Sequence, residues 1–264
     1  MRSFIDQLKR KISVVASPNR IVSLVPSQTE LLYSLGLRDE VVGITKFCVH
    51  PQEWFRSKTR IGGTKTLNIQ KIKSLRPDLI IANKEENVRE QIEELAREFP
   101  VWVSNVDTLP DACEMMESVG ALTGKGSEAK ELVANINRAF NQLQTPNPRP
   151  QTAYLIWKDP YMTVGGDTFI NEMLRRAGFE NVFAGCRRYP VITIDDLRLA
   201  NCRLLLLSSE PYPFKQKHVE DLKTVLPTTK IFLVDGELFS WYGSRLLHTP
   251  GYLKDLQRQI ATAT

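Results

Sequence analysis

Two segments of the chain, which begin at residues 68 and 193, show the same pattern of a helix followed by a strand. They lie 193 − 68 = 125 residues apart, and this internal repeat limits the possible folds more than any other feature. Residues 68–75 and 193–200 each predict an amphipathic helix that begins after a capping side chain, Asn68 or Thr193. A continuous apolar segment follows each helix, at residues 79–82 and 204–206, as is typical of a strand buried on both faces. Residues 36–43 and 178–185 also resemble each other. The repeat therefore predicts a duplicated α/β unit.

The first half of the chain alternates strands with helices. Ser27 and Glu30 form the pattern of a capping box, Gly36 ends that helix, and Asn87 with Glu90 opens another. Apolar segments predict the strands, at residues 21–25, 41–44, 79–82 and 101–103. This alternation is typical of a parallel sheet with helices on both faces.

One long helix marks the boundary between the two repeats. Residues 127–144 carry an uninterrupted apolar stripe, and Pro146, Pro148 and Pro150 follow it. We therefore expect an α/β fold with two lobes, each a parallel-sheet unit, joined by one long backbone helix. The expected parts are an N-terminal α/β lobe at residues 1–125, the connecting helix at 126–146 and a C-terminal α/β lobe at 147–264.

Composition excludes several classes of protein. A hydrophobic content of 42% with 25% charged residues is typical of a folded globular chain, and the net charge of +5 is not concentrated in a nucleic-acid-binding stripe. No apolar run is long enough to span a membrane, and the first seven residues lack the apolar segment of a secretory signal. We expect either a leaderless chain or one whose leader has been removed. The four cysteines lack metal-site spacing; buried free thiols are favoured, although disulfides stay open.

Enzyme motifs are incomplete. Residues 120–127 contain the glycines, lysine and serine of a phosphate-binding loop in the wrong spacing, and no nucleophile elbow is present. His50, His218 and His248 lie on separate segments and predict no metal site of their own. We therefore expect no enzyme activity, no resident metal and no required cofactor.

The loops after the strands are the candidate ligand site. Ligands of open parallel sheets bind beyond the carboxyl ends of the strands, and a cleft between two lobes is a preferred site. Aromatic residues concentrate in these loops in the second half, which favours a stacking surface for a flat ligand over core packing of the set. The predicted ligand-binding residues are Pro26, Ser27, Gln28, Phe47, His50, Asn83, Lys84, Trp157, Tyr161, Tyr189, Glu210, Tyr212, Trp241 and Tyr242.

Residues 20–30 and 75–82 resemble the class III periplasmic binding proteins, the receptors of ABC importers for vitamin B12, haem and ferric siderophores. The resemblance extends from about residue 6 to the C-terminal helix. It implies a substrate-binding protein that captures a metal chelate without chemistry, as a monomer that binds no nucleic acid, for a possible ABC permease. It also implies the periplasm or the cell envelope, while the missing signal peptide keeps a cytoplasmic location open.

Within this family, residues 179–183 are similar to the receptors for vitamin B12, which favours cobalamin or another corrinoid. Trp241 with Arg245 matches a segment that contacts the ligand there. Glu180 matches a glutamate that docks the importer; its first-lobe counterpart falls near Thr59, and Glu53 is the nearest carboxylate.

Two alternatives stay open at this point. One is a haem or ferric-siderophore receptor of the same fold, in which Tyr161, Tyr189, Tyr242 or His50 would ligate the iron. The other is a leaderless cytoplasmic carrier or sensor of corrinoids.

Overall fold

The computed structural model describes residues 1–263 and divides into two compact units. Each unit is discontinuous in the sequence. Unit 1 consists of Met1–Val106, Pro110–Asn135 and Tyr242–Arg245, and unit 2 of Asp107–Leu109, Ile136–Trp241 and Leu246–Thr264. The division falls within helix α6 (Gly126–Asn141), which ends five residues before the predicted limit at 146. The segment Tyr242–Arg245, expected in the C-terminal lobe, lies in unit 1.

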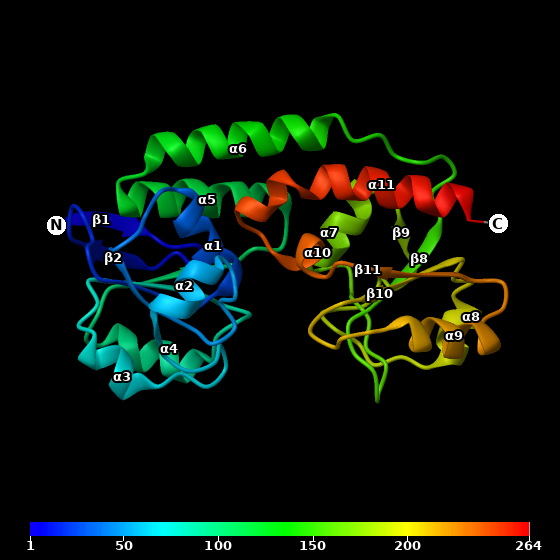
Figure 1. Cartoon of the computed structure of the whole chain (residues 1–264), viewed down its shortest axis with the longest axis horizontal. Coiled ribbons are helices and arrows are strands. Elements are labelled where there is room, and N and C mark those ends of the chain that lie inside the picture. The colour runs from blue at the N-terminus through cyan, green and yellow to red at the C-terminus, as the bar shows by residue number, and fades with distance from the viewer. Residues whose placement is uncertain (264) are drawn as a thin grey trace. The chain divides into compact units, whose positions relative to one another are not determined.

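Unit 1 contains a five-stranded parallel sheet. Its strand order is β5 (Thr59–Arg60), β4 (Val41–Ile44), β3 (Ile21–Ser23), β6 (Leu79–Asn83) and β7 (Val101–Ser104). From β3 the chain first adds β4 and β5 on one side of that strand, and then adds β6 and β7 on its other side. Because crossovers between parallel strands are right-handed, this reversal places helices on both faces. They are α1 (Pro26–Ser34) and α2 (Gln52–Ser57), then α3 (Ile69–Ser74) and α4 (Arg89–Ala96) (Figure 1).

Unit 2 repeats this arrangement with four parallel strands. Their order is β11 (Lys230–Val234), β10 (Leu204–Ser208), β8 (Gln151–Leu155) and β9 (Glu180–Asn181). The sequence β9-β8-β10-β11 thus matches β4-β3-β6-β7, as the internal repeat predicts. The helices are α7 (Phe169–Arg176), α8 (Ile194–Leu199), α9 (Gln216–Val225), α10 (Glu237–Ser240) and α11 (Thr249–Thr262). A 3-10 helix, η1 (Ser244–Leu247), precedes α11.

The repeated helices begin and end as the sequence predicts. Asn68 Oδ1 accepts the backbone N–H of Lys71 at 3.0 Å and caps α3. Thr193 Oγ1 accepts the N–H of Asp196 at 3.2 Å and caps α8. Gly36 and Gly178 follow α1 and α7 with φ of +86° and +70°, the left-handed conformation that ends a helix. The structure therefore confirms the parallel-sheet α/β fold and its repeat.

Two predicted helix starts are wrong. Helix α1 begins at Pro26 without a side-chain cap, because proline has no N–H to satisfy at this position, and Ser27 is only 4% exposed. Helix α4 begins at Arg89, two residues after Asn87. The Asn87 side chain instead accepts from the Asn83 N–H at 2.9 Å and donates to the Thr64 carbonyl at 3.1 Å. Ser27 is buried in the core, and the Asn87 side chain bonds to backbone groups outside α4, so neither residue caps its helix.

Three elements of unit 1 were not predicted. Strands β1 (Arg2–Ile5) and β2 (Lys11–Val14) form an antiparallel hairpin, and α5 (Leu109–Thr123) precedes α6. A Cβ on Gly120 would lie 2.4 Å from the Ala129 Cβ, so these small residues let α5 and α6 approach closely. Gly124, with φ of +73°, ends α5. The glycines at 120–126 thus build a helix hairpin. No helix among residues 1–263 has both the length and the apolar character to cross a bilayer.

Candidate functional site

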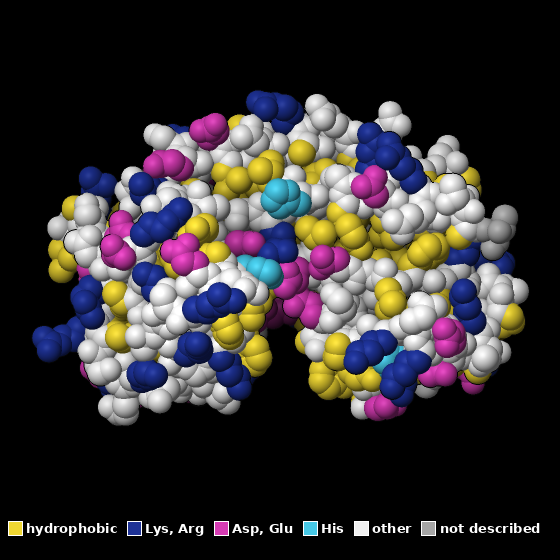
Figure 2. Space-filling view, viewed as in Figure 1, with side chains coloured by type: hydrophobic (Ala, Val, Ile, Leu, Met, Phe, Trp, Pro, Cys, Tyr) yellow, Lys and Arg dark blue, Asp and Glu magenta, His cyan; other side chains and the backbone are white. Residues whose placement is uncertain are grey.

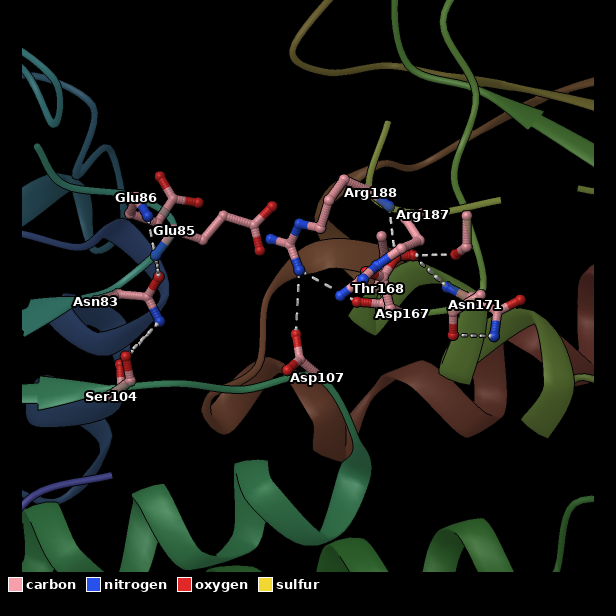
Figure 3. A network of polar contacts seen from close by, with 12 residues as sticks. Asn83, Glu85, Glu86, Ser104, Asp107, Asp167, Thr168, Asn171, Arg187 and Arg188 are labelled. Atoms are coloured by element: carbon pink, nitrogen blue, oxygen red, sulfur yellow. Dashed lines mark hydrogen bonds and ion pairs between the residues drawn. The ribbon is translucent and has the colours of Figure 1, made fainter. Parts of the chain in front are cut away.

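A buried polar network lies at the carboxyl edge of the unit 1 sheet (Figure 3). Gln28 Nε2 donates to Ser104 Oγ at 2.5 Å, and Asn83 Nδ2 donates to the same oxygen at 2.9 Å. Asn83 Oδ1 accepts the backbone N–H groups of Glu85 and Glu86 at 2.8 and 3.0 Å. Gln28 is fully buried and Asn83 is 2% exposed. These two predicted ligand residues are therefore buried, and their hydrogen bonds hold the loop after β6 in place.

The remaining predicted residues of this edge differ in exposure. Phe47 is 49% exposed, with the Lys46 ammonium 5.1 Å from its ring. Lys84 is exposed, and His50 is half-buried. Pro26, at the start of α1, is also half-buried. Among these side chains, Phe47 and Lys84 are the most accessible to a ligand.

Tyr242 and Arg245 belong to unit 1 rather than to the second sheet. Arg245 Nε and Nη2 donate to the two carboxylate oxygens of Glu30 at 3.0 and 2.7 Å. Gly243 lies so close to α1 that a Cβ there would be 2.6 Å from the Ser27 carbonyl oxygen. Tyr242 is 7% exposed. This bidentate ion pair and close approach fix the segment 242–245 against α1.

An aromatic cluster lies at the carboxyl edge of the unit 2 sheet. The rings of Trp157 and Tyr212 meet edge to face with centroids 5.7 Å apart, and Tyr212 meets Phe214 at 4.7 Å. His218 supports Tyr212 from α9, with Nε2 3.4 Å from the phenol oxygen. Trp157 is 40% exposed, whereas Phe214 is buried. The Trp157 indole is therefore exposed, while the rings behind it are packed against one another. Figure 2 shows apolar and basic side chains exposed on this unit.

Glu210 organises the second half of this edge. Its Oε1 accepts the Ser240 hydroxyl at 2.9 Å and the indole N–H of Trp241 at 3.0 Å. Burial raises the pKa of Glu210 above its usual value. A Cβ on Gly236 would lie 2.5 Å from the Ser208 Oγ and 2.6 Å from the Glu210 Cγ, so a larger residue would force these side chains to shift. Trp241 is 8% exposed, and its indole is therefore mostly covered.

Unit 2 contains a charged network that the sequence did not predict (Figure 3). The Arg188 guanidinium lies 3.5 Å from Asp107. The backbone N–H of Arg188 donates to the Asp167 carboxylate at 2.5 Å, and this hydrogen bond holds the pKa of Asp167 below its usual range. Thr168 caps α7 next to it by accepting the N–H of Asn171 at 3.2 Å. The sequence contains a glycine pair, Gly165–Gly166, and a threonine before α7 that could have indicated this turn, but it carries no signal for the partners of Arg188.

Tyr161 and Tyr189 lie on neighbouring loops and are both half-buried. Tyr161 packs against the core of unit 2, and burial raises the pKa of its phenol. The Arg188 guanidinium lies 5.7 Å from the Tyr189 ring. Within residues 1–263, no three His, Cys, Asp or Glu side chains are grouped as a metal site.

The two glutamates predicted to dock an importer are both exposed. Glu180 begins strand β9 at the edge of the unit 2 sheet. Glu53 lies in the first turn of α2 and accepts the Tyr33 hydroxyl at 3.1 Å. Their docking role stays a prediction.

Comparison with known proteins gives relatives that cover most of the chain. The sequence model of one family, described as periplasmic binding protein, matches residues 21–224. The vitamin B12-binding protein of Vibrio vulnificus is 27% identical over 204 residues, which cover 75% of this chain and 74% of that protein.

Solved structures show the same fold. A possible iron-binding protein from Staphylococcus epidermidis superposes with a TM-score of 0.75 and 26% identity, covering 92% of this chain and 98% of that chain. The periplasmic haem-binding protein of Vibrio cholerae gives a TM-score of 0.79 at 19% identity, over 91% of this chain and 99% of that chain.

Proposed function

Because the chain belongs to the periplasmic binding protein family, we propose that it captures cobalamin or another corrinoid for delivery to an ABC importer. Family members are substrate-binding transport proteins rather than enzymes. The proposed step is therefore reversible capture, in which no bond of the ligand is made or broken.

The aromatic surface of unit 2 carries the proposal. The exposed Trp157 indole packs edge to face against Tyr212 and can stack on the face of a large flat macrocycle. The similarity to vitamin B12-binding proteins supports the same ligand class.

A haem receptor is the second candidate, supported by the haem-binding protein with the same fold. Tyrosine ligation of haem iron uses the phenolate, and burial raises the pKa of Tyr161, which disfavours that form. Both ring nitrogens of His218 face hydrogen-bonding partners, since Nδ1 accepts the Lys215 N–H at 2.8 Å and Nε2 faces Tyr212. Stacking without a protein ligand to the metal suits a corrinoid, whose cobalt brings its own axial ligands, better than haem.

Titration separates the two candidates. Cyanocobalamin, dicyanocobinamide, haemin and a ferric hydroxamate siderophore are each added to the purified protein, and binding is followed by calorimetry. Saturable binding of one corrinoid per chain, tighter than that of haemin, supports the proposal. Tight haemin binding with no heat from either corrinoid would refute it and favour the haem receptor.

Two matched variants test the stacking surface. Trp157→Ala should weaken corrinoid binding by about 1–3 kcal/mol, roughly 5- to 150-fold in Kd, because the exposed stacking face is lost. Leu199→Ala is the control, because Leu199 is 85% exposed but ends α8, which leads to the opposite, amino-terminal edge of the sheet. Equal affinities of both variants would remove Trp157 from the ligand site.

The importer step has its own test. Glu180→Gln and Glu53→Gln should leave the Kd for the ligand unchanged and reduce ligand uptake in cells that depend on this protein. Unchanged uptake in the double variant would place the docking surface elsewhere.

A further inference from the structure

The hairpin of β1 and β2 has an inward face and an outward face, and the outward face carries Ser3, Ile5, Lys11 and Ser13. Val14 is fully buried against unit 1 and shares the inward face with Phe4 and Ile12, which pair across the hairpin. Ile5 pairs with Lys11 on the opposite face and is 66% exposed. In the same segment Met1 and Leu8 are also exposed, by 92% and 37%. Large apolar side chains thus gather outside the core in one short element.

The charges of this segment are almost all positive. Arg2, Lys9 and Lys11 are exposed. Asp6 is the one acidic residue among residues 1–15, and it is 2% exposed and paired with Arg10 at 2.7 Å. Residues 1–15 therefore offer basic and apolar side chains with no exposed carboxylate among them. In Figure 2, apolar side chains reach the surface at the edge where Figure 1 places β1, with basic and acidic side chains near them.

A polar pocket opens beside the hairpin, entirely within unit 1. Its volume is about 710 Å³, and its lining includes Arg2, Ser3, Ser127 and Lys130. Two basic residues and two serines, from β1 and α6, thus line one open space together with Phe4 and Ala121. This lining is complementary to a phosphate group.

We propose that the hairpin surface, defined as Ile5, Leu8, Lys9 and Lys11 with the pocket of Arg2 and Lys130, binds the surface of an anionic phospholipid bilayer. Ile5 and Leu8 enter the headgroup region, and the basic side chains bind lipid phosphates, one of which occupies the pocket. Each basic residue near an anionic surface strengthens attraction about fivefold, and this attraction falls as salt screens it. The contact is peripheral and reversible, and it does not depend on the identity of the ligand.

Vesicle co-sedimentation of the full chain tests this surface. Vesicles of phosphatidylcholine alone are compared with vesicles containing about 30% phosphatidylglycerol, at low and high salt. We expect binding only to the anionic vesicles, weakened at high salt. Equal binding to both vesicle types would overturn the proposal.

Charge-matched variants locate the contact. Lys9→Glu with Lys11→Glu should weaken vesicle binding at least about 30-fold, because two attractive charges are lost. Lys217→Glu with Lys223→Glu makes the same charge change on exposed positions of α9 and should weaken it far less. Lys130→Gln tests the pocket without altering the hairpin and should weaken binding several-fold.

Two results would overturn the assignment. One is an equal loss in the α9 pair, which would mean that net charge alone drives binding. The other is a dimer in solution that the hairpin variants dissociate while vesicle binding is absent, which would assign the surface to a second copy of the chain. Circular dichroism spectra of the same variants, compared with the wild type, confirm that each is folded.

Discussion

Gly243→Ala tests the packing that fixes the segment 242–245 to unit 1. The new Cβ would lie 2.6 Å from the carbonyl oxygen of Ser27, whereas Cβ atoms in proteins essentially never come within 3.0 Å of such an atom. The backbone must therefore shift by at least 3.0 − 2.6 = 0.4 Å. Ser27 lies in the first turn of α1 and is 4% exposed, so the helix cannot yield without disturbing its packing.

The magnitude follows from two opposing effects. Overpacking of this kind costs about 1–3 kcal/mol. Replacing glycine by alanine also lowers the entropy of the unfolded chain, which offsets about 0.4–1 kcal/mol. We expect a net loss of about 1–2 kcal/mol in the free energy of unfolding. For a chain of this size, the melting temperature should fall by about 2–8 °C.

Thermal unfolding followed by circular dichroism measures this change. Gly251→Ala is the matched control, because Gly251 lies within α11 and a Cβ there would meet no atom within 4 Å. That variant should gain up to about 1 kcal/mol from the better helix propensity of alanine. If Gly243→Ala is as stable as the wild type or the control, the close approach of residue 243 to α1 does not exist.

Three further predictions concern single side chains. Thr193→Ala removes the α8 cap and should lower the free energy of unfolding by about 1 kcal/mol in urea denaturation. Burial lowers the pKa of His218 below its usual 6.5, so the imidazole of the unfolded chain is protonated at a higher pH than that of the folded chain. The free energy of unfolding should therefore fall as the pH drops from about 6.5 through the folded pKa. In His218→Gln, which keeps an acceptor for the Lys215 N–H, urea denaturation should show a smaller fall. Burial raises the pKa of Cys202 to about 11, so a thiol reagent at pH 8 should modify exposed Cys186 quickly and Cys202 only after unfolding, and equal rates would contradict this.

The sheets and most helices could be predicted because they depend on apolar periodicity. Burial on both faces demands continuous apolar strands such as β6 and β10, which are fully buried. The hairpin was not predicted because its strands have only four residues each. Its turn is held by the Asp6 carboxylate, which accepts the backbone N–H groups of Leu8 and Arg10, and such contacts leave no periodic signal in the sequence. The prediction of buried thiols holds for Cys48 and Cys202, whereas Cys186 is exposed and Cys113 is half-buried.

The candidate site was only partly predictable, because the sequence does not say what covers a side chain. Trp157 follows strand β8 and Trp241 follows helix α10, yet both are loop aromatics in the sequence, and Trp157 is 40% exposed whereas Trp241 is 8% exposed. The difference comes from Glu210, which lies 241 − 210 = 31 residues away and accepts the Trp241 indole N–H. Arg245 was expected to face a ligand, and its guanidinium forms a bidentate pair with Glu30. Such distant partners leave no pattern in one sequence.

The return of Tyr242–Arg245 to unit 1 has a consequence for biosynthesis. A ribosome delivers the N-terminal unit first, and domains generally begin to fold as they emerge. Unit 1 lacks the Arg245 guanidinium that pairs with Glu30 until nearly the whole chain has been translated. By then Ile136–Trp241 of unit 2 has already been made. The unit that is synthesised first is thus completed near the end, and a nascent chain stalled before residue 242 should expose an unfilled surface on α1.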